Sequence, residues 1–170
     1  MSNKVYYTND HVTSWVQTIL RGITNDVLKD DWKPDYIVGL TRGGLIPAVM
    51  ISHYLGIPMH TLKVSLRDDI EGPESNLWMA EDALGGKNIL IVDDINDSGE
   101  TLKWIKQDWP KSAYPNDARW QTVWNNSIRF AALVNNQSSS FKDVDYFGME
   151  INKFENPNQW IVFPWEDWWT

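Results

Sequence analysis

Cysteine is absent from the 170 residues, which excludes both a disulfide framework and a thiolate metal site. Positive charge is also scarce, because 15 Lys and Arg residues stand against 23 Asp and Glu, giving a formal net charge of −8. Nucleic-acid binding by phosphate neutralisation requires clustered Lys and Arg, so we expect no nucleic-acid partner. An anionic small molecule is still compatible with this charge, since a ring of backbone amides can bind phosphate locally.

Long hydrophobic runs are missing as well. The N-terminal residues have no apolar core of signal-peptide length, and no later stretch is long enough to span a bilayer. We therefore expect a cytoplasmic protein without a membrane partner. The Walker pattern Gly-x-x-x-x-Gly-Lys-Ser/Thr and the pattern Gly-x-Gly-x-x-Gly do not occur either. Tryptophan, in contrast, is abundant, with 11 residues of which four fall within 160–169.

Hydrophobic spacing predicts strands that alternate with helices in one domain of residues 1–170. Helices are expected after a cap at 8–10, ending near 30, and over 45–55, where Gly56 and Pro58 form a stop signal. Buried strands are expected over 36–40, 59–66, 89–92 and 128–134, with an edge strand over 145–150. This alternation favours an α/β fold, with a Rossmann-like parallel sheet flanked by helices.

Three segments lack a clear period. Residues 67–82 contain Gly-Pro and are interpreted as an excursion that could form a short hairpin. An excursion of this length inside a compact domain is usually functional. Residues 110–127 are polar and carry tryptophans, with a helix expected near 117–124. The tail from 156 to 170 is aromatic and interrupted by proline.

The most informative stretch runs from Asn88 to Thr101. A buried strand is expected to stop at Asp93 and Asp94, and a polar turn over 96–99 then leads into a helix with apolar spacing. In parallel sheets, ligands bind at the carboxyl ends of the strands, where the loop 41–44 would also lie. Both loops are therefore predicted to open on one crevice.

The turn before this helix offers backbone amides, hydroxyl groups and a helix N-terminus, which together can hold a phosphate. Taken alone, the turn is more typical of an ordinary helix cap. The two preceding carboxylates, Asp93 and Asp94, favour the functional interpretation, because adjacent carboxylates repel each other and need a cation, hydroxyl donors or both. A ribose diol bound beside Mg²⁺ would satisfy them.

These residues resemble a known family. Residues 91–101, Ile-Val-Asp-Asp-Ile-Asn-Asp-Ser-Gly-Glu-Thr, resemble the 5-phosphoribosyl-1-pyrophosphate (PRPP) signature of type I phosphoribosyltransferases. Residues 38–47 are similar to the pyrophosphate loop of the bacterial xanthine-guanine and hypoxanthine enzymes. Residues 159–166 are similar to the segment of those enzymes that covers the purine, called the hood, here about 150–170. The resemblance covers most of the chain, and 110–127 looks like an insertion.

The resemblance implies a function. The chain would transfer 5-phosphoribose from PRPP to a nucleobase, a purine in salvage, and release pyrophosphate with Mg²⁺ as cofactor. It would act as a homo-oligomer, a dimer or a tetramer, and 67–82 would close as a lid that excludes water. The PRPP site would comprise Thr41, Arg42, Gly43, Asp93, Asp94, Asp97, Ser98, Gly99, Glu100 and Thr101.

Individual roles also follow from the resemblance. Asp97 matches the proposed catalytic base, and Asp93 and Asp94 would bind the ribose hydroxyls and orient water on Mg²⁺. The pyrophosphate loop often has a non-proline cis peptide in this family. The purine would contact Trp160 and Ile161 and would also be bound by Asn135. Asn135, or Ala132 in another register, replaces a lysine that related 6-oxopurine enzymes place near the end of the fourth strand.

Other interpretations stay open. The tryptophans of the tail could pack against the domain or form an oligomer interface instead of contacting a base. The chain could also be a PRPP-sensing or nucleotide-sensing regulatory homologue, or a catalytically silent interaction module. The joint presence of Asp93, Asp94, Asp97 and Thr101 favours the enzyme.

Overall fold

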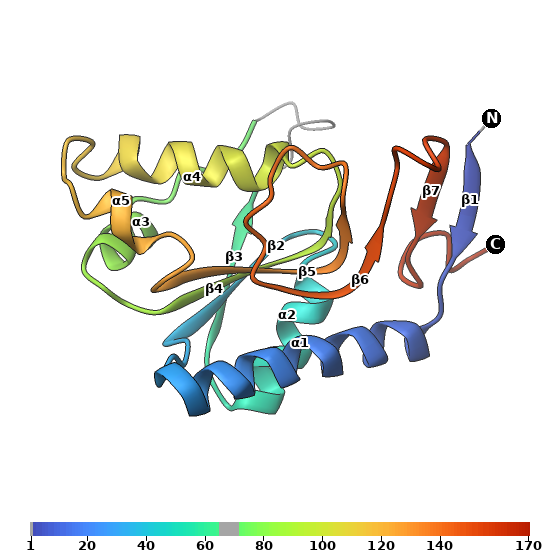
Figure 1. The fold of residues 1–170 in the computed structure, drawn as a ribbon, viewed down its shortest axis with the longest axis horizontal. Helices are drawn as coiled ribbons and strands as arrows, with labels where there is room; N and C mark the ends of the chain where they lie inside the picture. The colour runs from blue at the N-terminus through green and yellow to red at the C-terminus, as the bar shows by residue number, and fades with distance from the viewer. Residues whose placement is uncertain (1, 65–71) are drawn as a thin grey trace.

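The computed structural model describes residues 2–64 and 72–170, and its centre is a five-stranded parallel sheet in the order β3-β2-β4-β5-β6 (Figure 1). The strands are β2 (Tyr36–Thr41), β3 (Met59–Lys63), β4 (Ile89–Asn96), β5 (Ile128–Asn136) and β6 (Tyr146–Ile151). The helices are α1 (Asn9–Asp30), α2 (Leu45–Leu55), α3 (Leu77–Leu84), α4 (Glu100–Ser112) and α5 (Trp120–Val123). The predicted α/β class is confirmed.

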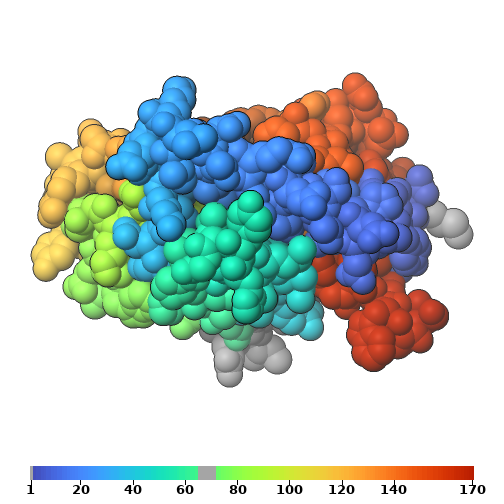
Figure 2. Space-filling model, turned by 90° about the horizontal axis from the view of Figure 1, so that it is seen from below, coloured from blue at the N-terminus to red at the C-terminus, as the bar shows by residue number. Residues whose placement is uncertain are grey.

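Helices cover both faces of the sheet. Alternate residues of each central strand point to opposite faces, so apolar side chains on both faces pack against helices. In β4, Ile89 and Ile91 join a core with α3, α4 and α5, whereas Leu90 and Val92 join a core with α1 and α2. Figure 1 shows these two layers above and below the sheet, and Figure 2 shows α1 and α2 side by side on the lower face. The strongly apolar strand sequence thus reflects burial on both sides.

A second, two-stranded sheet joins the two ends of the chain. Strand β1 (Asn3–Tyr6), which the sequence did not predict, pairs in parallel with β7 (Gln159–Val162). In this register Lys4 lies opposite Trp160 and Val5 opposite Ile161. The predicted C-terminal hood therefore includes the first residues of the chain, and Figure 1 shows both termini on this side of the molecule.

Helix and strand boundaries agree closely with the prediction in the first half of the chain. Thr8 caps α1, where its hydroxyl oxygen accepts from the His11 amide, and α2 has the predicted bounds. Strand β4 is longer than predicted, since it continues through the two carboxylates to Asn96. The expected edge strand is β6, at the end of the sheet opposite β3.

The predictions for the segments without a clear period need correction. Of the predicted excursion over 67–82, residues 67–71 lie outside the described residues, but 77–82 belong to helix α3, which buries Met79 and Ala80. The helix expected near 117–124 is a short turn of helix, α5, and α4 extends to Ser112 through Pro110. Within 2–64 and 72–170, no helix has the length and apolar character needed to cross a membrane.

Tryptophans of 110–127 pack into the core. The Trp120 ring stacks on Trp124 with centroids 5.8 Å apart, and Trp124 stacks on Phe130 of β5 at 6.1 Å. The indole of Trp120 also donates to the carbonyl oxygen of Ala113 at 2.9 Å. This segment therefore extends the hydrophobic core between α4 and the sheet.

Candidate active site

A cavity of about 840 Å³ lies at the carboxyl ends of β2, β3 and β4. Three parts of the chain enclose it: the loop after β2, the segment from the end of β4 into α4, and the hood. Lys63, the last residue of β3, and Lys153, which follows β6, also line it. The predicted convergence of the two loops on one crevice is observed.

The loop after β2 lies directly against the acidic pair. The Thr41–Arg42 peptide bond is cis, which confirms the non-proline cis peptide expected in this loop. A methyl group on Gly43 would lie 1.8 Å from Oδ2 of Asp94, and one on Gly44 would lie 2.5 Å from the carbonyl oxygen of Val92. The two glycines are therefore required by close approach of the loop to β4, and the side chain of Arg42 is exposed beside them.

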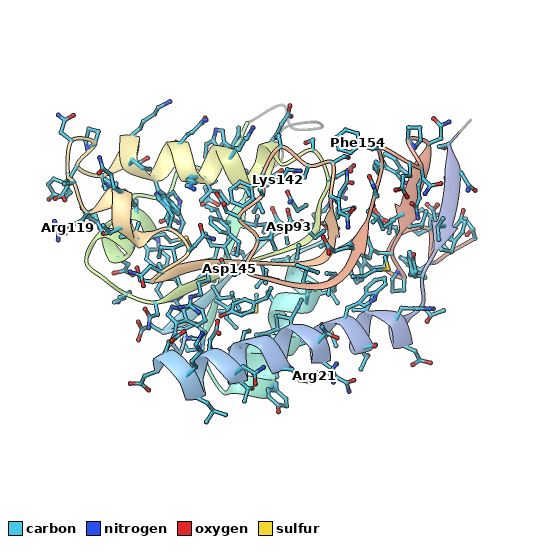
Figure 3. All side chains as sticks on the ribbon, viewed as in Figure 1. Arg21, Asp93, Arg119, Lys142, Asp145 and Phe154 are labelled. Carbon is cyan, nitrogen blue, oxygen red and sulfur yellow. The ribbon has the colours of Figure 1, made fainter. Side chains whose placement is uncertain are left out.

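Asp93 and Asp94 lie at the floor of the cavity. Asp93 Oδ1 accepts from the Asp94 amide at 2.9 Å, and Asp94 Oδ1 accepts from the Ile95 amide at 2.8 Å. Burial raises the pKa of Asp93 well above its usual value, and the neighbouring charge of Asp94 adds to this. Burial also raises the pKa of Asp94. Figure 3 shows Asp93 on the same side of the sheet as α4.

This carboxylate pair fits a magnesium ion bound through water. Both carboxylates line the cavity, and a cation there would oppose the effect of burial, which raises their pKa values. The part of the chain that the structure describes holds no group of three or more His, Cys, Asp or Glu residues able to enclose a metal. Two carboxylates match the usual magnesium site, in which substrate phosphates and waters supply the other ligands.

The turn from Asp97 to Thr101 presents the N-terminus of α4 to the cavity. Gly99 has a φ of +89°, and a methyl group there would lie 2.4 Å from the Phe141 amide nitrogen. Ser140 fixes the turn from behind, since its hydroxyl and its amide both donate to the Ser98 carbonyl oxygen, at 2.7 and 2.9 Å. The backbone amides of the first helical turn and the partial positive charge there suit a phosphate.

Asp97 is held by two neighbours. Asn136 Nδ2 donates to its Oδ1 and to its carbonyl oxygen, both at 3.1 Å, and Lys153 Nζ forms an ion pair with its Oδ2 at 2.8 Å. Asn136 itself is 3% exposed. The carboxylate of Asp97 is therefore fixed in direction, next to the turn that begins α4.

The hood forms the wall opposite this turn. Ile161 is buried, whereas Trp160 is 47% exposed and lines the cavity. Phe163 and Trp165 also line the cavity; their rings stack with centroids 4.8 Å apart, and the Phe163 amide donates to Glu166 Oε2 at 2.9 Å. A flat ligand could bind against this wall.

The cavity brings together nearly all of the predicted site. Its lining contains Thr41, Arg42, Gly43, Asp93, Asp94, Asp97, Ser98, Gly99, Glu100, Thr101, Trp160 and Ile161.

Asn135 is the exception, since it is not among the described residues that line the cavity. Its Oδ1 accepts from Asn96 at 2.9 Å and its Nδ2 lies 3.5 Å from Glu150, so we do not keep it in the base site. Lys153, in contrast, lines the cavity although no motif in the sequence indicated it. Its only signal was its position just after the edge strand, in a protein poor in basic residues.

Comparison with known proteins yields a consistent result. A family model described as the phosphoribosyl transferase domain matches residues 6–168. A xanthine-guanine phosphoribosyltransferase of Cereibacter sphaeroides is 31% identical over 134 residues, which are 76% of this chain and 68% of the relative. A xanthine-guanine phosphoribosyltransferase of Idiomarina loihiensis is 29% identical over 134 residues, covering 76% of this chain and 70% of the relative.

Solved structures agree with these relatives. A purine phosphoribosyltransferase from Pyrococcus horikoshii superimposes with a TM-score of 0.63 at 30% identity, covering 96% of this chain and 94% of that chain. A xanthine-guanine-hypoxanthine phosphoribosyltransferase from Helicobacter pylori superimposes with a TM-score of 0.62 at 18% identity, covering 97% and 95%, and shows the same fold.

Proposed function

This chain belongs to the phosphoribosyltransferase family, and we propose that it transfers 5-phosphoribose from PRPP to a purine base with release of pyrophosphate. The observation that carries this proposal is one cavity of about 840 Å³, in which two adjacent carboxylates, a helix N-terminus and an exposed indole face the same space. Such a space can hold a sugar, a phosphate and a flat base at the same time. The names of the relatives, which include xanthine-guanine and purine enzymes, support a purine as the acceptor.

The PRPP end of the cavity has a donor or acceptor for each part of the molecule. The amides and hydroxyls of 97–101 would bind the 5′-phosphate at the start of α4, where a negative charge is stabilised. Asp93 and Asp94 would accept hydrogen bonds from the two ribose hydroxyls. Arg42, exposed at the loop that touches Asp94, would contact the pyrophosphate.

Magnesium bound to PRPP would neutralise part of the pyrophosphate charge and so make it a better leaving group. As the bond from the anomeric carbon to the pyrophosphate oxygen breaks, positive charge develops on the ribose. The carboxylates below the ribose stabilise this charge electrostatically. The base nitrogen forms the new bond to the anomeric carbon, and Asp97 accepts the proton that this nitrogen loses. The products are a nucleotide and pyrophosphate.

The test is an incubation of the protein with PRPP, Mg²⁺ and a panel of free purines and pyrimidines, with nucleotide formation measured by chromatography. We expect a nucleotide from at least one purine and none from the pyrimidines. Asp97→Asn should lower kcat by about 10² to 10⁴-fold, the usual contribution of a positioned base. Asp143→Asn is the matched control, because this carboxylate is half exposed and pairs with Lys106 outside the cavity.

A protein that makes no nucleotide from any base would contradict the proposal and favour a regulatory homologue that binds PRPP or nucleotides without turnover. Calorimetry with PRPP and Mg²⁺ would then separate that homologue from a silent interaction module. The cytoplasmic location and the dimer or tetramer stay predictions.

A further inference from the structure

The end of β5 and the residues that follow it, 136–141, form a supporting segment behind the turn that begins α4. Figure 1 shows this segment beside the start of α4. The described residues that line the cavity do not include it, so it can act on a ligand there only through the turn. The two parts pack closely, since a methyl group on Gly99 would lie 2.4 Å from the Phe141 amide nitrogen and 2.6 Å from Ser139 Oγ. The supporting segment therefore sets the position of the turn.

The supporting segment binds two consecutive carbonyl oxygens of the turn. Asn136 Nδ2 donates to the carbonyl oxygen of Asp97 at 3.1 Å. The next carbonyl oxygen, that of Ser98, accepts from both the hydroxyl and the amide of Ser140, at 2.7 and 2.9 Å. Both carbonyl groups are thus directed at the supporting segment.

The supporting segment is itself anchored to the sheet. Asn136 is 3% exposed, and its Oδ1 accepts from the Ser138 amide at 3.1 Å. Ser139 is 1% exposed, and its hydroxyl donates to Oδ1 of Asn96, the last residue of β4, at 3.0 Å. The same hydroxyl oxygen accepts from the Phe141 amide at 3.1 Å. Buried polar groups that are all hydrogen-bonded make a rigid support.

These bonds determine where the amides of the turn point. A peptide unit is planar, and in its trans form the C=O and the N–H point in opposite directions. The units that join Asp97 to Ser98 and Ser98 to Gly99 are trans. Because their carbonyl groups point back to the supporting segment, the amides of Ser98 and Gly99 point away from it. Both residues line the cavity, and no residue within 2–64 and 72–170 accepts a hydrogen bond from either amide. Two donors are therefore directed at the cavity before a ligand binds.

We propose that Ser140 and Asn136 are positioning residues for PRPP binding. From behind the turn they aim the Ser98 and Gly99 amides at the 5′-phosphate. This inference rests on the proposed function, since it concerns the phosphate that the same turn would hold. A donor that is already oriented needs no ordering when the ligand arrives, so its hydrogen bond contributes more to affinity.

A segment that only packs against the domain is the competing explanation, and it predicts something different. In that case a substitution in the segment lowers stability and leaves the affinities of the folded protein unchanged. If the segment aims the amides, the substitution weakens only those ligands that carry the 5′-phosphate. The decisive quantity is therefore the ratio of the affinities for a nucleotide and for the matching nucleoside, which lacks the phosphate.

The experiment measures the binding of PRPP with Mg²⁺, of the 5′-monophosphates of guanosine and inosine, and of the two nucleosides by competition, all by calorimetry. Ser140 suits this test because its side chain is exposed and should contribute little to stability. Ser140→Ala removes the hydroxyl bond and keeps the amide bond. We expect it to lower the affinity for PRPP and for both nucleotides by roughly 2- to 10-fold, the usual contribution of one hydrogen bond. The affinity for the nucleosides should not change, and Ser140→Thr, which keeps the hydroxyl, should retain the wild-type affinities.

Asn136→Ala tests the second support. It removes the bond to the Asp97 carbonyl oxygen and should weaken the same ligands as Ser140→Ala does. It should also lower kcat, which Ser140→Ala should leave nearly unchanged at saturating PRPP, because Asn136 also holds the carboxylate of the proposed proton acceptor. Asn136 is buried, so Ser140→Ala remains the deciding variant if Asn136→Ala does not fold.

Ser112→Ala is the matched control. Ser112 is the last residue of α4, where its hydroxyl donates to the Asp108 carbonyl oxygen at 3.0 Å, far along the helix from the turn. The substitution removes the same kind of bond outside the cavity and should leave every affinity unchanged. Circular dichroism and thermal melting would confirm that each variant is folded before affinities are compared.

The outcomes separate the two proposals. A wild type that binds PRPP and the nucleotides, together with a folded Ser140→Ala that binds them equally well, would overturn the role of the supporting segment and leave the proposed function intact. An equal loss for nucleotides and nucleosides would overturn that role as well, because the loss would not depend on the phosphate. A wild type that binds neither PRPP nor a nucleotide would refute the proposed function, and the positioning role with it.

Discussion

The substitution Asp93→Asn should make the protein more stable while it abolishes its activity. Asn has nearly the same shape, and its side-chain oxygen can still accept from the Asp94 amide, as Asp93 Oδ1 does at 2.9 Å. The substitution removes one of two adjacent charges at the floor of the cavity. Asn also supplies only one acceptor oxygen, so it cannot bind two ribose hydroxyls as a carboxylate can.

The pH dependence follows from the direction of the pKa shift. In the unfolded chain an Asp side chain ionises near pH 4, but burial and the charge of Asp94 raise the pKa of Asp93 in the folded state. Between these two pKa values the folded protein binds more protons than the unfolded protein, so its stability falls as the pH rises. This loss is absent below about pH 4 and is complete above the folded pKa. Asn does not titrate, so the variant should escape the loss.

The direction of the shift fixes the sign of the effect, and because the Asp93 side chain faces the cavity and is only partly buried, solvent screening keeps the effect small. We expect Asp93→Asn to be more stable at pH 7 by about 0.5 to 2 kcal/mol, the usual range for a single stabilising substitution, or roughly 1 to 8 °C in Tm for a chain of this size. The advantage should shrink as the pH is lowered and vanish near pH 4.

Thermal melts at several pH values between 4 and 8, without substrate, measure this effect. Asp143→Asn is the control, since its exposed ion pair with Lys106 should contribute less than about 1 kcal/mol. A variant less stable than the wild type at pH 7, or a stability difference that does not change with pH, would refute the electrostatic reasoning. Activity assays on the same samples would confirm that the more stable variant is inactive.

Three further substitutions test other parts of the structure. Gly43→Ala places a methyl group 1.8 Å from Asp94 Oδ2, so PRPP affinity measured by calorimetry should fall by at least about 10-fold, and unchanged affinity would contradict the tight loop. Gly148→Ala brings a methyl group 2.1 Å from Trp15 Cβ, and urea unfolding should show a loss of about 2 to 4 kcal/mol with the site intact. Thr8→Ala removes the cap of α1 and should cost about 1 kcal/mol in the same assay, whereas Thr8→Ser should cost much less.

The central part of the site could be predicted from the sequence because its signals are local. A buried strand, two carboxylates and a glycine-containing turn follow each other within residues 88–101. Because they are consecutive in the chain, they also lie together in space. The loop at 41–44 follows the neighbouring strand β2, so the parallel order of the sheet places it beside this turn. The local sequence pattern and the topology of the sheet therefore predict the same site.

The part of the cavity around Asp97 and Lys153 could not be predicted in the same way. Side chains alternate along a strand, so a shift of one residue changes the face on which a side chain lies. In β5, Asn136 contacts Asp97, while Asn135 points to Asn96 and Glu150. The sequence does not fix this register, and it could not place Lys153, which depends on where the chain turns after β6.

Helix α3 shows a signal that was present but weak. The Asn76 side chain accepts from the Met79 amide at 3.3 Å and so caps the helix, and the residues that follow include good helix formers. Gly72 and Pro73, just before, indicated an irregular segment and masked this cap. Eight residues are too few for periodicity to outweigh such neighbours.

The pairing of β1 with β7 has a consequence for how the protein becomes active. Residues 3–6 are synthesised before the central sheet, whereas their partner strand, 159–162, is synthesised after it. The proposed ribose and phosphate site at 93–101 is therefore translated before the indole of Trp160 can be placed. A chain cut just before Gln159 should retain the residues of that proposed site but lack the surface against which we propose that a base stacks. A substitution that displaces β1 should disturb that same surface, although β1 is far from it in the sequence.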